Sequence, residues 1–182
     1  GIAEGFTAAE LISLRDAARL WEHRPTAEQK VRVETDRDLL RQTAASRRFG
    51  EVRLFRYAEQ FSETQQQQFS ATAFLLDSDT VYVAFRGTDN TLTGWREDFN
   101  LSFLPYVPSQ AAAAAYLRGI LSLGFSNVYV GGHSKGGNLA IYAAVNAESA
   151  AKNRILGVYN NDGPGFHHEF LTTEAYKSMS HL

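Results

Sequence analysis

The sequence predicts a three-layer α/β fold with a mostly parallel central sheet, formed by a single domain over residues 1–182. Strand-like and helix-like segments alternate through the second half of the chain, and the connections between them are short. Hydrophobic residues make up 44% of the 182 residues, which is enough for one core. A second folding domain is therefore not expected.

Residues 1–50 are predicted to be helical and to pack on the outside of the sheet. Two capping boxes, at residues 7–10 (Thr-Ala-Ala-Glu) and 26–29 (Thr-Ala-Glu-Gln), each mark the start of a helix. Gly50 is a plausible end to this segment. Four apolar residues share one helical face after the first box: Leu11, Leu14, Ala18 and Trp21.

The sequence from residue 51 to 108 predicts three strands and a long loop. Apolar and polar side chains alternate over residues 51–57 and 69–76, which indicates two strands. The Gln-rich run at 62–68 is interpreted as a hairpin loop between them, not as a functional tract. Residues 80–86 are apolar enough for a central strand, and 87–108 are expected to form a loop.

From residue 109 onward, helices and strands are expected to alternate. Helices are predicted at 109–121, from 137 to about 151, and at 169–179. Strands are predicted at 127–132 and 154–159, and a turn at 160–165. This order supports the α/β architecture.

The pentapeptide Gly132-His133-Ser134-Lys135-Gly136 carries the main chemical prediction. It lies between a strand-like run and a helix-like run, with a further glycine at position 137. Strand, tight turn and helix in this order are typical of a nucleophile elbow, in which the serine hydroxyl is exposed at the carboxyl edge of a parallel sheet. The sequence therefore predicts an α/β-hydrolase fold with Ser134 as the nucleophile.

A serine nucleophile also needs a histidine base, an orienting carboxylate and oxyanion donors. The amide of Lys135 is expected to be one donor, with its side chain directed away from the site as a solvated cation. Asp162 follows the next strand and is a candidate for the triad acid, although a turn residue is an equal alternative.

No histidine of this sequence is assigned as the base. Those that follow Ser134, namely His167, His168 and His181, are expected on the surface, and the ring of His133 is expected to point away from the serine. We expect the base to lie outside this chain, which is then a hydrolase domain truncated at its C-terminus.

Three motifs together resemble a known family. They are Phe-Arg-Gly-Thr-Asp at 85–89, Gly-Trp-Arg-Glu-Asp at 94–98, and Gly-His-Ser-Lys-Gly-Gly-Asn-Leu-Ala at 132–140. The sequence is similar to class 3 lipases and, more closely, to a bacterial family of uncharacterised lipase-like hydrolases, over roughly residues 69–166. The resemblance implies that Thr88 is the second oxyanion donor and that Asp98 holds its loop by a hydrogen bond. The alternative is that 87–90 is simply a turn.

These observations favour an ester hydrolase that forms an acyl-enzyme on Ser134 and needs no metal or organic cofactor. Small-molecule or lipid esters are the expected substrates, and the apolar run at 99–108 could line an acyl pocket, form a lid, or simply pack under the core. The alternative function is a non-catalytic binding module with an incomplete triad. A phosphate-binding loop is disfavoured, because the lysine follows the serine instead of preceding it.

Composition excludes several other classes of protein. There is no cysteine, so disulfides and thiolate metal sites are excluded, and the five histidines show no metal-ligand spacing. A net charge of -2 with mixed signs disfavours nucleic-acid binding. No apolar run is long enough for a transmembrane helix, and no secretory leader opens the sequence, so a cytoplasmic protein is expected.

Overall fold

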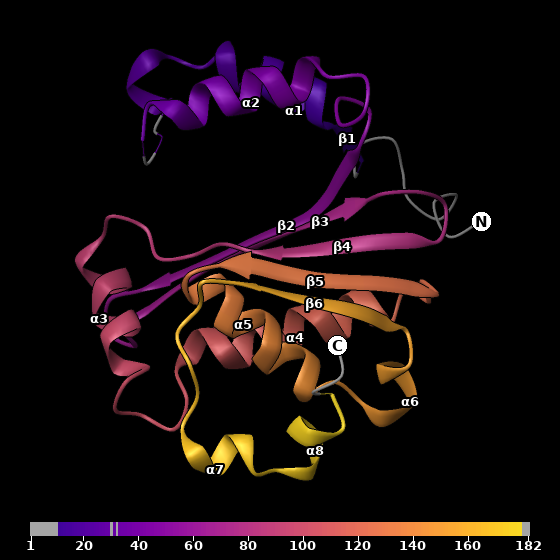
Figure 1. Cartoon of the computed structure of the whole chain (residues 1–182). Helices are drawn as coiled ribbons and strands as arrows, with labels where there is room; N and C mark the ends of the chain where they lie inside the picture. Colours follow the sequence, from indigo (N-terminus) through magenta and orange to yellow (C-terminus); the bar gives the residue numbers. More distant parts are fainter. Residues whose placement is uncertain (1–10, 30, 32, 180–182) are drawn as a thin grey trace.

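The computed structural model describes residues 11–29, 31 and 33–179, and its centre is a six-stranded sheet. Each strand pairs with the one that follows it in the chain (Figure 1). The strands are β1 (Ile12–Ser13), β2 (Arg53–Ser62), β3 (Gln67–Leu75), β4 (Thr80–Phe85), β5 (Asn127–His133) and β6 (Ile155–Asn161).

The sheet is mixed, so the prediction of a mostly parallel sheet is wrong for the described residues. Strands β1 to β4 pair in antiparallel fashion, and only β4 with β5 and β5 with β6 are parallel. The connections from β2 to β3 and from β3 to β4 span only residues 63–66 and 76–79. Such short connections cannot carry the chain back to a parallel start, so they dictate antiparallel pairs. The α/β class itself is confirmed.

The N-terminal helices α1 (Leu14–Glu22) and α2 (Thr35–Ala45) lie beside β1 and the start of β2 (Figure 1). Helix α1 is capped by Ser13, whose Oγ accepts a hydrogen bond from the amide of Asp16. The first predicted capping box, at 7–10, lies outside the described residues. The second begins only a single 3-10 turn, Thr26–Glu28, which ends because Gln29 leaves the helical conformation (φ −78°, ψ 58°).

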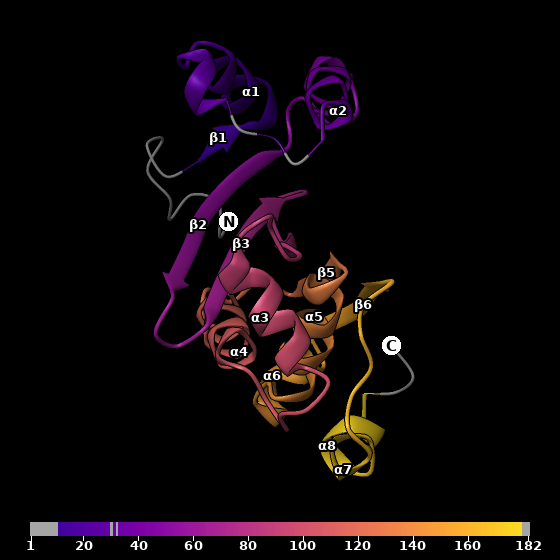
Figure 2. The same cartoon turned by 90° about the vertical axis from the view of Figure 1, so that its left-hand side faces the viewer.

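Helices α4 (Pro108–Leu121) and α5 (Lys135–Val145) cover one face of the sheet (Figures 1 and 2). Helix α3 (Leu92–Asn100) forms within the segment predicted as a loop, where Thr91 Oγ1 caps it by accepting from the amide of Gly94. The predicted final helix is instead two short helices, α7 (His168–Leu171) and α8 (Glu174–Lys177). The predicted helix to about residue 151 ends at Val145, and α6 (Ser149–Lys152) follows separately.

The core lies between the sheet and the pair α4 and α5. Alternate residues of β4 and β5 point into it and meet apolar side chains from the two helices. Burying each large aliphatic side chain contributes about 1.5–3 kcal/mol. This packing holds the carboxyl ends of β4 and β5 against the start of α5. The fully buried residues here include Val81, Val83, Val128, Val130, Leu117, Ile120 and Leu139.

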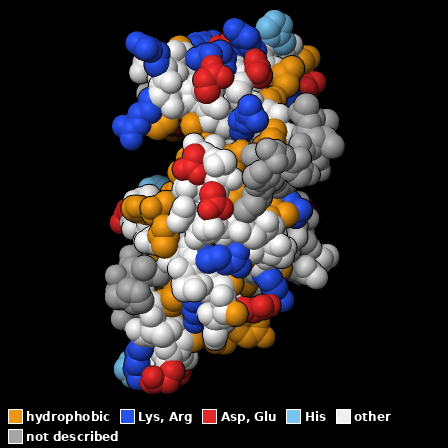
Figure 3. Space-filling model, turned by 90° about the vertical axis from the view of Figure 1, so that its right-hand side faces the viewer, with side chains coloured by type: hydrophobic (Ala, Val, Ile, Leu, Met, Phe, Trp, Pro, Cys, Tyr) orange, Lys and Arg blue, Asp and Glu red, His pale blue; other side chains and the backbone are white. Residues whose placement is uncertain are grey.

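The surface over the N-terminal helices carries charges of both signs. Figure 3 shows Lys and Arg side chains interspersed with Asp and Glu at the top of this face, without an extended patch of one sign. Among the described residues, no helix combines the length and apolar character required to cross a bilayer.

Candidate active site

Ser134 occupies the turn between β5 and α5 in a backbone conformation that is unusual for a residue with a side chain. Its φ is 55° and its ψ is −131°. Such a conformation costs about 1–3 kcal/mol and persists only where the surroundings impose it. Here the amide of Ser134 donates to the carbonyl of Asn161 (2.9 Å), and its carbonyl accepts from the amide of Gly137 (2.8 Å).

Two glycines of the motif allow the start of α5 to pack directly on the end of β4. A Cβ atom on Gly132 would lie 2.5 Å from the carbonyl oxygen of Phe85, and a Cβ atom on Gly136 would overlap the same oxygen. No side chain fits at either position without a shift of the backbone. The strand, turn and helix predicted around Ser134 are therefore present, and they are tightly packed.

Ser134 opens into a pocket of about 520 Å³ that lies beside α3. The predicted acid, Asp162, lines the same pocket and has a φ of 55° in the turn after β6. Two aromatic side chains of α3, Trp95 and Phe99, form another wall and are 57% and 67% exposed. One wall of the pocket is therefore polar, and another is aromatic. Its lining residues are Trp95, Asp98, Phe99, Ser102, Ser134, Asp162, Gly163 and Pro164.

The loop that carries Asp162 is anchored by Asn138, which sequence reasoning did not identify. The Asn138 side chain is fully buried, and its Nδ2 donates to the carbonyls of Pro164 (3.0 Å) and Gly165 (3.2 Å). Its Oδ1 accepts from Gln110 Nε2 (2.8 Å). Gln110 Oε1 in turn accepts from the amide of Val107 (3.0 Å). The hydrogen-bonded side-chain amides of Asn138 and Gln110 therefore connect this loop to the start of α4.

The loop after β4 lies against the other side of Ser134. A Cβ atom on Gly87 would be 2.7 Å from the carbonyl oxygen of His133 and 3.4 Å from Ser134 Cβ. The next residue, Thr88, is buried, and its Oγ1 has no hydrogen-bond partner in the described chain. Within the same residues, the amides of Thr88 and Lys135 donate to no protein acceptor. Two unpaired amides thus occur in the segments that flank Ser134.

Asp98 lines the pocket but forms no hydrogen bond with the Thr88 loop among the described residues. The hydrogen bonds of this loop come from Asp89 and Gln68 instead. Asp89 Oδ1 accepts from the amide (2.9 Å) and the hydroxyl (2.5 Å) of Thr91. Gln68 Oε1 accepts from the amide of Asp89 (3.3 Å).

The interpretation of Lys135 as a solvated cation is wrong, because its side chain is fully buried. Its Nζ donates to Glu97 Oε2 (2.8 Å), to the carbonyl of Gln68 (2.6 Å) and to Gln68 Oε1 (3.0 Å). Glu97 is also fully buried and accepts from the amide of Gln68 (2.9 Å) and from the amide and hydroxyl of Ser109 (2.9 and 2.8 Å). All three Lys135 protons and both Glu97 oxygens are therefore used.

The Gln-rich run is only partly a loop, which corrects its interpretation as a hairpin connection. Gln67 and Gln68 belong to β3, and both are buried. Gln68 is one of the residues that contact Lys135. The Gln-rich run therefore includes one residue, Gln68, with a specific structural role.

Among the described residues, no histidine lines this pocket. His133 is exposed at the end of β5, and His167 and His168 lie at the start of α7. His167 Nε2 is buried and has no hydrogen-bond partner in the described chain. His181 lies outside the described residues. No group of three or more potential metal ligands occurs in the described part of the chain.

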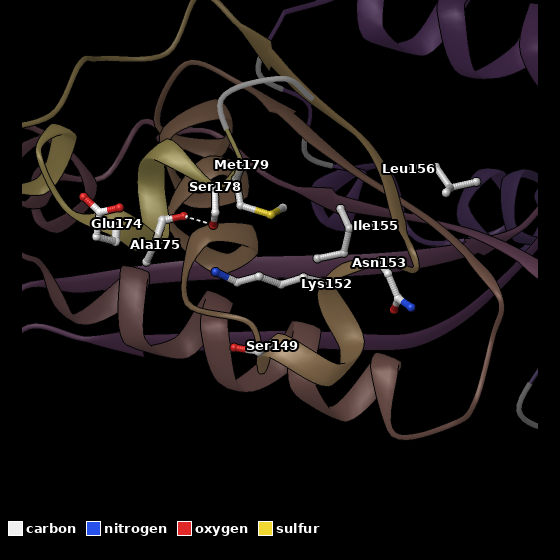
Figure 4. Close-up of a pocket in the computed structure, with 9 residues that line it drawn as sticks. All are labelled: Ser149, Lys152, Asn153, Ile155, Leu156, Glu174, Ala175, Ser178 and Met179. Atoms are coloured by element: carbon white, nitrogen blue, oxygen red, sulfur yellow. Dashed lines mark hydrogen bonds between the residues drawn. The ribbon is translucent and has the colours of Figure 1, made fainter.

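A larger cavity, of about 860 Å³, lies elsewhere (Figure 4). Its walls come from α6, α8 and the first residues of β6, Ile155 and Leu156. Ser134 follows the end of β5, which runs parallel to β6. The larger cavity is therefore at the opposite edge of the parallel strands, and the smaller pocket is the one that contains the candidate nucleophile.

Comparison with known proteins gives one family and one solved structure of low similarity. No curated protein matches the chain. A fungal lipase, from an inhibitor complex described as a model for interfacial activation in lipases, aligns with 19% identity and a TM-score of 0.41. The alignment covers 57% of this chain and 44% of the lipase chain. The Mbeg1-like family model matches residues 43–181, which places the chain in the Mbeg1-like family.

Proposed function

We propose that this domain is a serine hydrolase that cleaves carboxylic esters through an acyl-enzyme on Ser134. In the proposed reaction, Ser134 Oγ attacks the carbonyl carbon while a base takes its proton. The bond to the alkoxy group then breaks, and the alcohol leaves with that proton. Water then attacks the carbonyl carbon of the acyl-enzyme in the same way, the bond to Ser134 Oγ breaks, and the carboxylic acid is released. No cofactor takes part, and no described residue is assigned as the base.

The conformation of Ser134 is the observation that carries this proposal. A serine at φ 55° and ψ −131°, on the turn from a parallel strand into a buried helix, opens into a pocket. Strained backbone of this kind clusters at functional sites. The proposal assigns the amides of Thr88 and Lys135 as oxyanion donors, with the unpartnered Thr88 hydroxyl as a further donor. It assigns Asp162, which shares the pocket, as the triad acid.

The aromatic wall of the pocket favours an ester with an apolar acyl group. Trp95 and Phe99 are largely exposed beside Ser134, where an acyl chain could cover them. Removing apolar surface from water contributes about 25 cal/mol for each Å². The proposed substrates are therefore small-molecule or lipid esters with an apolar acyl chain.

The direct test is labelling of the full-length protein with a fluorophosphonate probe, followed by mass spectrometry of the labelled peptide. We expect the label on Ser134, and we expect Ser134→Ala to lose both the label and ester hydrolysis, with kcat reduced on the order of 10⁵-fold or more. Ser149→Ala, in the larger cavity, is the matched control and should label normally. A folded protein that remains unlabelled would contradict the proposal and favour a binding module.

The acyl-binding wall can be tested separately with a series of esters of increasing acyl length. Phe99→Ala should reduce kcat/KM for octanoyl esters about tenfold more than for acetyl esters, because only the longer chain reaches the lost ring. Phe49→Ala removes an exposed ring outside the pocket and should leave the ratio unchanged. An equal loss for both chain lengths would show that Phe99 does not contact the acyl group.

A further inference from the structure

The buried polar cluster beneath the site connects the two segments assigned as oxyanion donors. It consists of Gln68, Glu97, Ser109 and Lys135, all of which are nearly or fully inaccessible to solvent. Lys135 follows the candidate nucleophile directly, and Asp89 follows Thr88. A single atom, Gln68 Oε1, accepts hydrogen bonds from Lys135 Nζ (3.0 Å) and from the amide of Asp89 (3.3 Å).

The orientation of the Gln68 amide group is determined by these partners. Both groups that contact Oε1 can only donate, so exchanging the oxygen and nitrogen would place donors against donors. Helix α3 closes over the same group, since a Cβ atom on Gly94 would lie 3.3 Å from Gln68 Oε1 and 3.2 Å from Thr88 Cγ2. The Gln68 side chain is thus enclosed between the Thr88 loop, α3 and the start of α5.

The main chain of Gln68 is fixed by the same cluster. Its amide donates to Glu97 Oε2 (2.9 Å), and its carbonyl accepts from Lys135 Nζ (2.6 Å). Glu97 belongs to α3, so its ion pair with Lys135 joins α3 directly to α5, and Gln68 of β3 contacts both partners. These contacts lie behind Ser134, and none of the four cluster residues lines the pocket. The side chains of the cluster are therefore not placed to touch a substrate, whereas the main-chain amide of Lys135 is the proposed oxyanion donor.

We propose that Gln68, supported by the Lys135–Glu97 ion pair, is a positioning residue that sets the spacing between the Thr88 and Lys135 amides. The inference rests on the proposed function of those amides. Oxyanion stabilisation depends on donors held at about 2.7–3.1 Å from the developing charge. The shared acceptor fixes the residue after Thr88 relative to the side chain of Lys135, so its loss allows the two donors to separate.

The test compares Gln68→Met with Gln67→Met in the full-length protein. Methionine keeps the length of the side chain but removes the shared acceptor. The control loses one hydrogen bond of the same strand, from Gln67 Nε2 to Gln60 Oε1 (3.0 Å), which does not reach the site. We expect Gln68→Met to lower kcat and the rate of fluorophosphonate labelling about 100-fold with little change in KM, because the lost interaction acts in the transition state.

Hydrogen exchange separates this inference from the proposed function, because it needs no activity. The Asp89 amide should exchange at least about tenfold faster in Gln68→Met than in Gln67→Met. Unchanged Asp89 exchange, or equal kinetics in the two variants, would overturn the positioning role. If the parent protein is never labelled at Ser134 but Asp89 exchange rises, the connection between the segments holds and the catalytic assignment fails.

Discussion

Glu97→Ala should lower the free energy of unfolding by about 3–5 kcal/mol, because it leaves the Lys135 ammonium buried without its counter-charge. The amide and hydroxyl of Ser109 and the amide of Gln68 also lose an acceptor in this variant. Each buried donor left without a partner adds to the loss. Chemical denaturation of the full-length protein measures the change.

Glu59→Ala is the matched control for this prediction. Glu59 pairs with Arg86 at 3.1 Å, and both side chains are about half exposed, at 50% and 47%. A pair that is open to solvent contributes at most about 1 kcal/mol. Adding Lys135→Met to Glu97→Ala should recover part of the loss, since it removes the uncompensated charge. Similar losses for Glu97→Ala and Glu59→Ala would contradict the assignment of a strong buried pair.

Gly136→Ala should destabilise the fold by about 3 kcal/mol and abolish most of the proposed activity. The new Cβ atom would overlap the carbonyl oxygen of Phe85 and lie 2.9 Å from its carbon, so α5 must move away from β4. That movement displaces Ser134 and the amide of Lys135. A shift of about 1 Å in reacting groups costs roughly 100-fold in rate.

The control for this substitution is Gly119→Ala, in the middle of α4. The nearest atom to a Cβ atom there is Arg56 Nη1 at 3.9 Å, so the methyl group fits. Alanine is the better helix former by about 1 kcal/mol, and this variant should be slightly more stable than the parent. If Gly136→Ala unfolded at the same denaturant concentration as the parent, the close contact between α5 and β4 would not exist in solution.

The parts of the fold that could be predicted from the sequence are those with a local cause. The turn at Ser134 follows from two glycines between a β-rich run and a helix-forming run, all within residues 127–145. The antiparallel half of the sheet could also have been predicted, because the connections after β2 and β3 are too short for parallel pairs. Helix α3 lies within residues 87–108, which are predicted to be a loop, although Thr91 is of a residue type that favours the start of a helix.

The buried cluster could not be predicted, because its members meet only in the folded chain. Lys135 is 38 residues from Glu97 and 67 from Gln68 along the sequence. A lysine is rarely fully buried, so the sequence alone favours an exposed side chain. Only after β3, α3 and α5 are placed together does one carboxylate become available to it. The role of Asn138 depends on tertiary contacts in the same way.

The side-chain amides of Asn138 and Gln110 link the turn after β6 to the start of α4. Asn138 holds the turn at Pro164, and Gln110 holds Val107, which ends the segment that follows α3. These bonds oppose separation of that turn from the segment that ends at Val107. We therefore expect the turn at Pro164 to keep the same distance from the start of α4 with and without a bound ligand.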